Sequence, residues 1–273
     1  MCVPGCQQAV RQGLDRRRFL KTAGAGGAAV MVPPPATAQR IPPASFRTAI
    51  DLTHTMSGDF PTFFGVPGIE MQKQFDIKKD GFNLYWWRLI EHAGTHFDAP
   101  IHFAEGGATA DRIDVANLVV PLAVIDVAGK AASDPDYLVS RQDLAAWEER
   151  HGRLPDDCCV AMHSGWAQHL SSPARYTGKD AAGLFHFPGF GPEAAAWLIA
   201  ERRVRGLAVD TLSLDHGPST DFRTHRAWLP SGRWGLENVA GLDRVPPAGA
   251  TLVVGLAKVK DATGGPARLI ALA

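Results

Sequence analysis

Short runs of apolar residues, some continuous and some alternating with polar residues, predict a protein built largely from β-strands. Continuous runs such as residues 119–127 and 159–163 are typical of strands buried on both faces. Residues 69–75 and 82–90 flank Lys78-Lys-Asp-Gly81, whose Asp-Gly pair is typical of a hairpin, so these two strands are expected to pair antiparallel. The predicted strands are 49–52, 69–75, 82–90, 119–127, 159–163, 206–209, 251–258 and 267–272.

Two helices are predicted from the signals at their ends. Ser140-Arg-Gln-Asp143 has the form of a capping box ahead of a helix over 144–150, which Gly152 then ends. A second helix is expected to begin at Pro192, with Glu193 in its first turn. Its last turn would carry Arg202 and Arg203, and its buried face Ala195, Trp197, Leu198 and Ile199. Together these elements predict a mixed α/β domain.

Residues 168–191 contain many Ser, Pro and Gly residues and show no periodicity. A loop of this length is either an active-site lid or a plain surface excursion, and the sequence leaves both open.

The first 38 residues have the pattern of an export signal. Arg16-Arg-Arg-Phe-Leu-Lys21 precedes a weakly apolar, Gly- and Ala-rich stretch that ends in Ala36-Thr-Ala38. This order is typical of a twin-arginine signal cut after Ala38, which predicts a periplasmic or secreted domain of residues 39–273 and transient contact with the twin-arginine export machinery. No stable membrane anchor is expected, because the apolar stretch is short and three prolines interrupt it. The alternative is a disordered basic N-terminus.

Composition narrows the class of protein. The chain has 273 residues, 45% of them hydrophobic, and its 28 basic residues balance 28 acidic ones. That is the size of one globular domain, and the balanced charge favours a small-molecule substrate and no nucleic-acid partner. The adjacent Cys158 and Cys159 lie in an apolar segment, so we expect small buried hydrophobes, not a disulfide or metal ligands.

Four titratable residues fall together in His92-Ala-Gly-Thr-His-Phe-Asp-Ala-Pro-Ile-His102. On a straight strand His92 and His96 would lie about 13 Å apart, too far to share a metal ion. On a helix Asp98 would leave their face, and the internal glycine and proline oppose a helix. The segment is therefore expected to bend, so that His92, His96 and Asp98 converge on one cation.

Two histidines and one carboxylate that leave coordination positions of the metal ion open are typical of a catalytic metal site, and this ligand set suits Zn²⁺ or Mn²⁺. His102 is close enough to act on a water at the metal without being a ligand. The same ligand set also describes the facial triad of non-haem Fe(II) oxygenases, although the short spacing fits it poorly. A non-catalytic periplasmic protein that binds a metal or ligand is the other alternative.

The motif resembles the signature of the cyclase family of metal-dependent hydrolases, His-x-Gly-Thr-His-x-Asp-x-Pro-x-His, at every fixed position. This family includes bacterial kynurenine formamidases and isatin hydrolases. The resemblance continues through Ile50-Asp-Leu-Thr-His54, Pro61-Thr-Phe-Phe-Gly65, His163-Ser-Gly-Trp166, Asp210-Thr-Leu-Ser-Leu-Asp-His-Gly217, Asp221-Phe-Arg-Thr-His225 and Leu236-Glu-Asn-Val239. It implies an α/β, single-domain β/β/α (swivelling-domain-like) fold with a barrel-like mixed sheet flanked by helices. It also implies a homodimer or larger homo-oligomer.

The resemblance implies a metal centre with one or two Zn²⁺ or Mn²⁺ ions per subunit. The implied ligands are His92, His96 and Asp98 for the first ion, and Asp98, His225 and Glu237 for the second. His102 would be the proton shuttle. On the residues alone, Glu237 could equally be an ordinary carboxylate at the start of a helix.

The expected reaction is hydrolysis of an amide, formamide, lactam or lactone bond in a small aromatic or cyclic substrate by metal-activated water. Phe63 and Phe64 would bind a flat substrate, and Phe60, Trp86 and Trp87 would contribute if they line the pocket. Kynurenine formamidases tend to carry Trp where this chain has Phe63, which, with export, weakens the case for a tryptophan-catabolic enzyme. An arylformamidase proper is the alternative.

Overall fold

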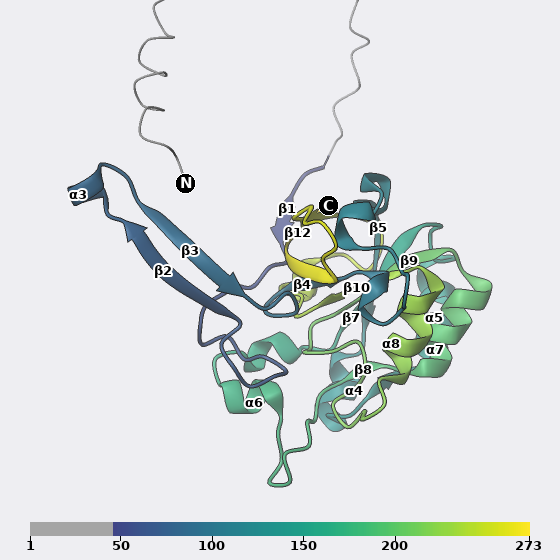
Figure 1. Cartoon of the computed structure of the whole chain (residues 1–273). Helices are drawn as coiled ribbons and strands as arrows, with labels where there is room; N and C mark the ends of the chain where they lie inside the picture. The colour runs from purple at the N-terminus through teal and green to yellow at the C-terminus, as the bar shows by residue number, and fades with distance from the viewer. Residues whose placement is uncertain (1–45) are drawn as a thin grey trace, which may run out of the picture. The chain divides into compact units, whose positions relative to one another are not determined.

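The fold is centred on a closed barrel of seven β-strands. The computed structural model describes residues 46–273. The barrel strands are β4 (His96–Asp98), β5 (Val119–Asp126), β7 (Cys158–His163), β9 (Val204–Val209), β10 (Trp234–Glu237), β11 (Ala250–Leu256) and β12 (Gly264–Leu272). They pair in the order β12-β11-β5-β7-β9-β10-β4, and β4 pairs back onto β12 (Figure 1). The expected α/β fold with a barrel-like mixed sheet is confirmed.

The pairing is parallel along one side of the barrel and antiparallel along the other. Strands β5, β7, β9 and β10 are parallel neighbours, whereas the pairs that involve β4, β11 and β12 on the remaining sides are antiparallel. Strand β1 (Ala49–Asp51) adds to β12. Parallel strands need crossover connections, and all the helices except the short one at Ile77–Asp80 lie in those connections.

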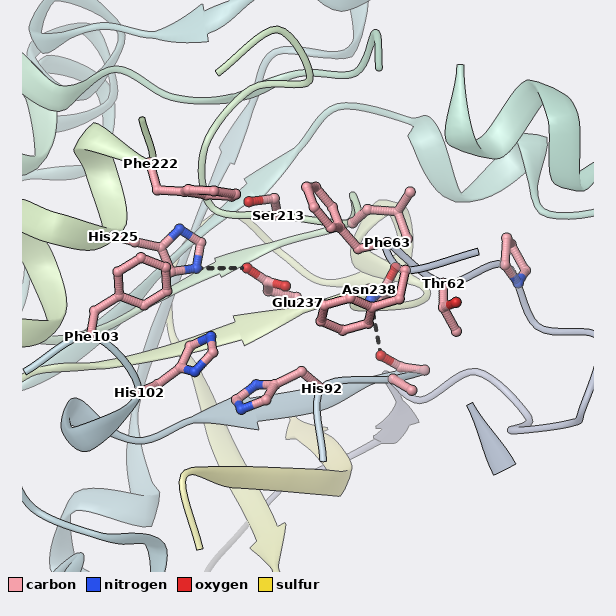
Figure 2. A pocket seen from close by; sticks show the side chains of 15 residues that line it. Thr62, Phe63, His92, His102, Phe103, Ser213, Phe222, His225, Glu237 and Asn238 are labelled. Atoms are coloured by element: carbon pink, nitrogen blue, oxygen red, sulfur yellow. Dashed lines mark hydrogen bonds and ion pairs between the residues drawn. The ribbon is translucent and has the colours of Figure 1, made fainter. Parts of the chain in front are cut away.

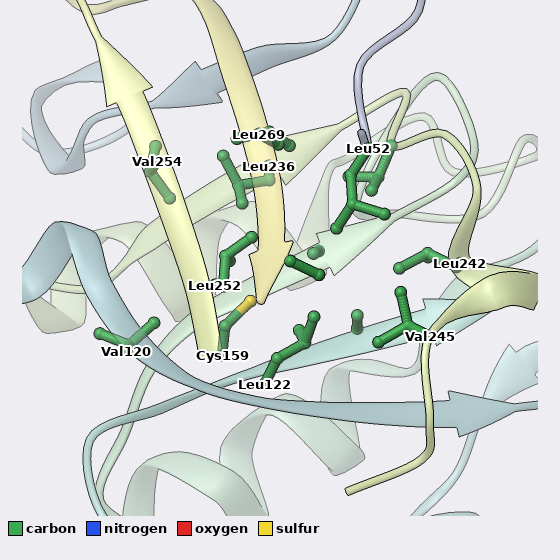
Figure 3. Close-up of a cluster of buried hydrophobic side chains, with 14 of the residues drawn as sticks. Leu52, Val120, Leu122, Cys159, Leu236, Leu242, Val245, Leu252, Val254 and Leu269 are labelled. Atoms are coloured by element: carbon green, nitrogen blue, oxygen red, sulfur yellow. The ribbon is translucent and has the colours of Figure 1, made fainter. Parts of the chain in front are cut away.

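The parallel strands separate two hydrophobic cores. On β5, Val120, Leu122 and Val124 point into the barrel, whereas Ala123 and Ile125 face the helices α5 (Arg141–His151) and α7 (Pro192–Glu201). Figure 3 shows the inner core, where side chains from opposite walls of the barrel meet. Each fully buried Val or Leu in such a core contributes roughly 1.5–3 kcal/mol by leaving water.

The same alternation explains the two cysteines. Cys159 belongs to the inner core and Cys158 to the outer one, because successive residues of a strand point to opposite faces. Both are buried, which confirms the expectation that they are small hydrophobic residues of the core. Continuous apolar runs on β5, β7 and β9 are buried on both faces as predicted, whereas β11 alternates buried and partly buried residues.

The capping box of α5 is confirmed, because Ser140 Oγ accepts a hydrogen bond from the backbone N–H of Asp143 and Gly152 caps the other end. The predicted end of α7 is wrong: Arg202 is the extended C-cap and Arg203 lies beyond it. From this position past the helix end, Arg202 Nη2 donates to Glu148 Oε2 at 2.7 Å, and the guanidinium lies over the ring of Trp197.

The sequence pattern did not predict strands β4 and β10. Glu237 is the last residue of strand β10 and does not begin a helix. The remaining helices are α3 (Ile77–Asp80), α4 (Ala128–Ser133), α6 (Pro173–Thr177) and α8 (Arg223–Trp228). Strands β6 (Leu138–Val139) and β8 (Gly189–Phe190) form a separate small sheet. Short 3-10 turns are η1 (Pro100–His102), η2 (Ala110–Arg112), η3 (Val115–Leu118), η4 (Trp166–His169), η5 (Leu229–Ser231) and η6 (Leu242–Arg244). The long segment 168–191 therefore contains α6 and β8.

Strands β2 (Ile69–Phe75) and β3 (Leu84–Leu89) form a second, two-stranded sheet, antiparallel as predicted. Figure 1 shows this hairpin extending away from the barrel. The turn closes through α3 and Gly81, whose φ of 82° suits a residue without a Cβ.

The predicted export signal lies outside the described residues. Within residues 46–273, none of the helices has the length and apolar character needed to cross a bilayer.

Candidate metal centre

Strand β4 carries two of the expected ligands at the closing seam of the barrel. It lies between β10 and β12, so Asp98 has Gly235 as its partner on one side and Gly264 on the other. A Cβ at Gly264 would lie 2.7 Å from the ring of His92, and one at Gly235 would lie 3.3 Å from the carboxylate of Asp98. The two glycines therefore leave the room that the cluster of titratable side chains occupies.

The bend expected before β4 is present. Gly94 has a φ of 65°, a conformation that L side chains rarely adopt. The turn brings the rings of His92 and His96 to a centroid distance of 5.3 Å. It also places His92 Nδ1 2.6 Å from Asp98 Oδ1. The segment is not loop throughout, since His96–Asp98 pairs as a strand.

Strand register and α8 bring the remaining expected ligands to the same place. Glu237 is the cross-strand partner of His96, and His225 comes from α8. His96 Nε2 lies 3.3 Å from both Asp98 Oδ1 and Glu237 Oε2, and His225 Nε2 lies 3.1 Å from Glu237 Oε1. The candidate ligand atoms form two groups, each within 4.8 Å: His92, His96 and Asp98, then Asp98, His225 and Glu237.

Two buried polar atoms in this cluster fit a bound cation. His96 Nε2 and Asp98 Oδ2 are buried and have no hydrogen-bond partner among the described residues. Such atoms are rare, because each costs about 1–3 kcal/mol unless something satisfies it. A divalent ion accepts electron pairs from an imidazole nitrogen and a carboxylate oxygen, so the donor set fits Zn²⁺ or Mn²⁺.

Hydrogen bonds orient each histidine toward the cluster. His96 Nδ1 lies 2.9 Å from the carbonyl oxygen of Gly94, which requires the proton on Nδ1 and leaves Nε2 as a lone pair. His225 Nδ1 lies 2.6 Å from Asp215 Oδ2, which likewise directs Nε2 to the carboxylates. Carboxylate and carbonyl partners of this kind fix the tautomer of metal-binding histidines.

His92 supplies a second argument for a cation. The hydroxyl of Thr263 donates to Glu91 Oε2 at 2.5 Å, so its oxygen is left to accept from His92 Nε2 at 2.9 Å. The proton of a neutral His92 is then on Nε2. Its bare Nδ1 faces the carboxylate of Asp98, and two lone pairs at 2.6 Å need a positive charge between them.

The electrostatics of the protein residues agree with this picture. Burial lowers the pKa of His96, but the carboxylates of Asp98 and Glu237, each 3.3 Å from Nε2, outweigh it and raise the pKa to about 10. Burial would raise the pKa of Asp98, yet the neighbouring imidazoles of His225, His92 and His96 hold it well below its usual value. The cluster favours positive charge beside its two carboxylates.

A pocket of about 160 Å³ opens onto these residues, similar in volume to a cavity of about 150 Å³ that holds benzene. Phe63 and Phe64 line it as expected, together with Phe103 and Phe222. Figure 2 shows Phe63, Phe103 and Phe222 around the cavity, together with Glu237, His92, His102 and His225. Phe60, Trp86 and Trp87 do not line this pocket: Phe60 is buried in the core, and Trp86 and Trp87 are exposed on the β2–β3 hairpin.

His102 lies in the wall of this pocket and belongs to neither ligand group. Its ring stacks on that of His92 at a centroid distance of 3.8 Å. Burial lowers the pKa of His102 to about 4, so the imidazole is neutral at pH 7, the form that accepts a proton.

Sequence reasoning missed several residues that support the site. Asn238 adopts a φ of 54° and donates from Nδ2 to the carbonyl of Gly94, which stabilises the turn between the candidate ligands His92 and His96. Asp215 and Thr263 were missed because hydrogen bonds to ligands leave no spacing signal when the partners are 10 and 171 residues apart.

The barrel and its titratable cluster define a hydrolase of the cyclase family. Residues 50–216 match the model of the family described as putative cyclase, and the chain belongs to that family. It is 33% identical to isatin hydrolase of Roseibium aggregatum over 216 residues, which cover 76% of this chain and 81% of that protein. It is 24% identical to kynurenine formamidase of Bacillus cereus over 229 residues, 81% of this chain and 95% of the relative.

The fold also matches a solved relative. Isatin hydrolase A from Labrenzia aggregata, bound to benzyl benzoate, superposes with a TM-score of 0.76 at 32% identity, over 82% of this chain and 93% of that one.

Residues 13–33 match the twin-arginine translocation signal, so the protein is exported by that pathway, as the sequence predicted.

Proposed function

We propose that this protein is a metal-dependent hydrolase that cleaves an amide or cyclic amide bond, or a related ester or lactone, in a small aromatic substrate. The observation that carries the proposal is the pair of overlapping ligand groups beneath an aromatic pocket, with two buried ligand atoms left without partners. The proposed ligands are His92, His96 and Asp98 for one ion, and Asp98, His225 and Glu237 for a second.

A divalent ion in this centre supplies an acidified water, whose pKa falls from about 15.7 toward about 7, and an electrophile for the carbonyl oxygen. His102 accepts the proton of the attacking water and passes it to the leaving nitrogen or oxygen, since its neutral ring lies against His92 and lines the pocket. Asp215 and Thr263 keep the ligand histidines in the required tautomers.

The aromatic wall selects the substrate and excludes water. Phe63 stacks on Phe185 at 4.7 Å, and Phe222 lies 5.9 Å from Phe63 and 5.8 Å from Phe103. Such rings favour a flat ring system over an extended aliphatic chain. The similarity to isatin hydrolase supports a cyclic amide, and the similarity to kynurenine formamidase supports an aryl formamide.

The working form that we propose is residues 39–273 in the periplasm or outside the cell, after the signal is cut behind Ala38. It holds one or two Zn²⁺ or Mn²⁺ ions per subunit and forms a homodimer or larger homo-oligomer. Its partners are the small substrate and, during export, the twin-arginine machinery.

The test is hydrolysis of isatin, N-formylkynurenine and an aryl lactone by the purified exported protein loaded with Zn²⁺ or Mn²⁺. We expect metal-dependent cleavage that His96→Ala abolishes and that His151→Ala, a change of the same residue type at an exposed position, leaves intact. Cleavage of N-formylkynurenine alone would identify an arylformamidase proper.

Two results would contradict the proposal. Stoichiometric metal binding with no product across the panel would favour a binding protein, and product formation that requires dioxygen would favour an Fe(II) oxygenase.

A further inference from the structure

Tyr176 of helix α6 is completely buried, and a phenol hydroxyl away from water needs a hydrogen-bond partner. Its hydroxyl lies 2.8 Å from Asn238 Oδ1, whereas the alternative acceptor, the carbonyl oxygen of Asp210, is 3.5 Å away. Burial raises the pKa of Tyr176 well above its usual value, so the phenol keeps its proton. The hydroxyl of Tyr176 therefore donates to the side chain of Asn238.

The amide of Asn238 can have only one orientation. One end of it lies 2.9 Å from the carbonyl oxygen of Gly94, which can only accept, so that end is the NH₂ group. Figure 2 marks this bond from Asn238 at the pocket. The other end is then the amide oxygen, which requires a donor, and Tyr176 supplies it.

The carbonyl oxygen of Gly94 also accepts a hydrogen bond from a candidate metal ligand. His96 Nδ1 lies 2.9 Å from this oxygen, which therefore binds Asn238 and His96 together. A carbonyl oxygen has two lone pairs, and both are then in use. The position of this acceptor sets the direction of His96 Nε2, the atom that faces the carboxylates of the cluster.

The backbone of Asn238 is fixed on both sides. Its N–H donates to the carbonyl oxygen of Thr211 at 2.9 Å, and its carbonyl oxygen accepts from Thr95 Oγ1 at 2.6 Å. Its φ of 54° is a left-handed conformation that asparagine tolerates better than most residues. With the backbone held, the freedom that remains is rotation of the side-chain amide, which the hydroxyl of Tyr176 restricts.

Tyr176 is itself held in place. Its ring packs edge-on against that of Phe60 at a centroid distance of 6.0 Å, and its carbonyl oxygen accepts from Trp166 Nε1 at 2.8 Å. The series of hydrogen bonds from Tyr176 to His96 therefore starts from a fixed point in the core.

We propose that Tyr176 is a positioning residue of the metal centre, which acts through Asn238 and the carbonyl group of Gly94 to hold His96 in the orientation that binds the first ion. The inference rests on the proposed metal centre. It gives the segment 168–191, which contains α6, a part in the site that is distinct from covering it.

The experiment measures metal binding to the exported protein with Tyr176→Phe, which removes one hydroxyl group and keeps the ring. The matched control is Tyr137→Phe, because the hydroxyl of Tyr137 also donates a hydrogen bond, to Asp143 at 2.8 Å, and Tyr137 belongs to neither ligand group. Titration of each protein against a chelator gives the dissociation constant for Zn²⁺. Circular dichroism verifies that each variant folds.

We expect Tyr176→Phe to raise the dissociation constant of the first ion about 10-fold, and Tyr137→Phe to change it less than about twofold. The second measurement is the visible absorption spectrum of the Co²⁺-loaded protein, which depends on the geometry of the ligands. Tyr176→Phe should alter this spectrum and Tyr137→Phe should not. A purely structural role of Tyr176 would lower stability without moving either readout.

A double substitution tests whether Tyr176 acts through Asn238. Asn238→Gly removes the amide, and glycine accepts the positive φ of this position. In the Asn238→Gly background, Tyr176→Phe should cause no further loss of metal affinity, because the hydroxyl group then has no amide to orient. Losses that simply add would overturn the inference.

The outcome for the unsubstituted protein separates this inference from the proposed function. If Tyr176→Phe leaves the affinity and the Co²⁺ spectrum unchanged while His96→Ala abolishes binding, the inference is overturned and the proposed metal centre stands. If the unsubstituted protein binds neither Zn²⁺ nor Mn²⁺ nor Co²⁺, both are overturned.

Discussion

Asp215 holds the imidazole of His225 with a 2.6 Å contact and also accepts the backbone N–H groups of Thr224 and His225. Asp215→Asn keeps the shape but removes the charge that fixes the tautomer of His225. We expect the affinity for the second metal ion to fall about 10- to 100-fold. Competition with a chromophoric chelator measures this.

Asp221→Asn is the matched control, because Asp221 is exposed and its side chain makes a single long contact of 3.5 Å. If Asp215→Asn and Asp221→Asn bind metal with equal affinity, Asp215 has no part in positioning His225.

His102 provides a second residue-scale prediction. His102→Ala should retain metal, since His102 belongs to neither ligand group, and should lower kcat by about 100-fold or more through loss of proton transfer. The measurement is steady-state hydrolysis of whichever substrate in the panel is cleaved, with metal content determined on the same samples. An unchanged kcat would remove His102 from the mechanism.

At the scale of elements, the contact between β9 and β10 depends on Gly206. It is the register partner of Trp234, and a Cβ there would lie 2.0 Å from the indole ring. Gly206→Ala should lower the free energy of unfolding by about 1–3 kcal/mol or more through overpacking. Thermal unfolding followed by circular dichroism measures the loss.

The control is Gly129→Ala in α4, where no heavy atom lies within 4 Å of the added methyl group. That change should be neutral or stabilising, because Ala has the higher helix propensity. Equal melting temperatures for the two variants would contradict the prediction.

Long elements with local signals are predicted from the sequence, whereas short ones are not. The hairpin and α5 were predicted because Asp-Gly and the Ser140–Asp143 box act within a few residues. Strand β4 has three residues and β10 has four, too short for any periodicity, and β4 pairs only with strands more than 100 residues away. Barrel closure was therefore expected from family resemblance alone.

The residues of the candidate site also differ in how far the sequence predicts them. His92, His96, Asp98 and His102 are recognisable because they are close in sequence. Phe103 and Phe222 line the pocket without any sequence signal, since an aromatic residue in the core and one in a pocket wall have the same pattern.

At the scale of the whole molecule, metal and stability should be linked. A ligand that binds only the folded state, at a concentration 100 times its Kd, raises the free energy of unfolding by about 2.7 kcal/mol. For a chain of this size, that corresponds to an increase in Tm of about 5–10 °C. Chelation should therefore lower Tm by this amount. Scanning calorimetry of chelated and Zn²⁺-loaded protein measures the difference.

The difference in Tm between the Zn²⁺-loaded and the chelated protein should grow as the pH rises. The pKa of His96 is raised to about 10 in the metal-free protein, because the nearby carboxylates of Asp98 and Glu237 outweigh burial. Its proton stabilises the metal-free fold fully below the unfolded value near 6.5, and this contribution is lost as the pH rises through about 10. Zn²⁺ must displace that proton, so its stabilisation weakens as the pH falls. A larger metal-induced shift at pH 6 than at pH 8 would contradict this linkage.

Strand β4 closes the barrel and presents His96 and Asp98 in the same three residues. A substitution there alters chemistry and architecture at once, so this part of the protein has little freedom to diverge. The rings of Phe63, Phe64 and Phe222 lie outside the strands of the barrel, where exchange of one side chain leaves the seam intact. A lineage with this architecture can inherit its reaction unchanged and diversify the molecules on which it acts.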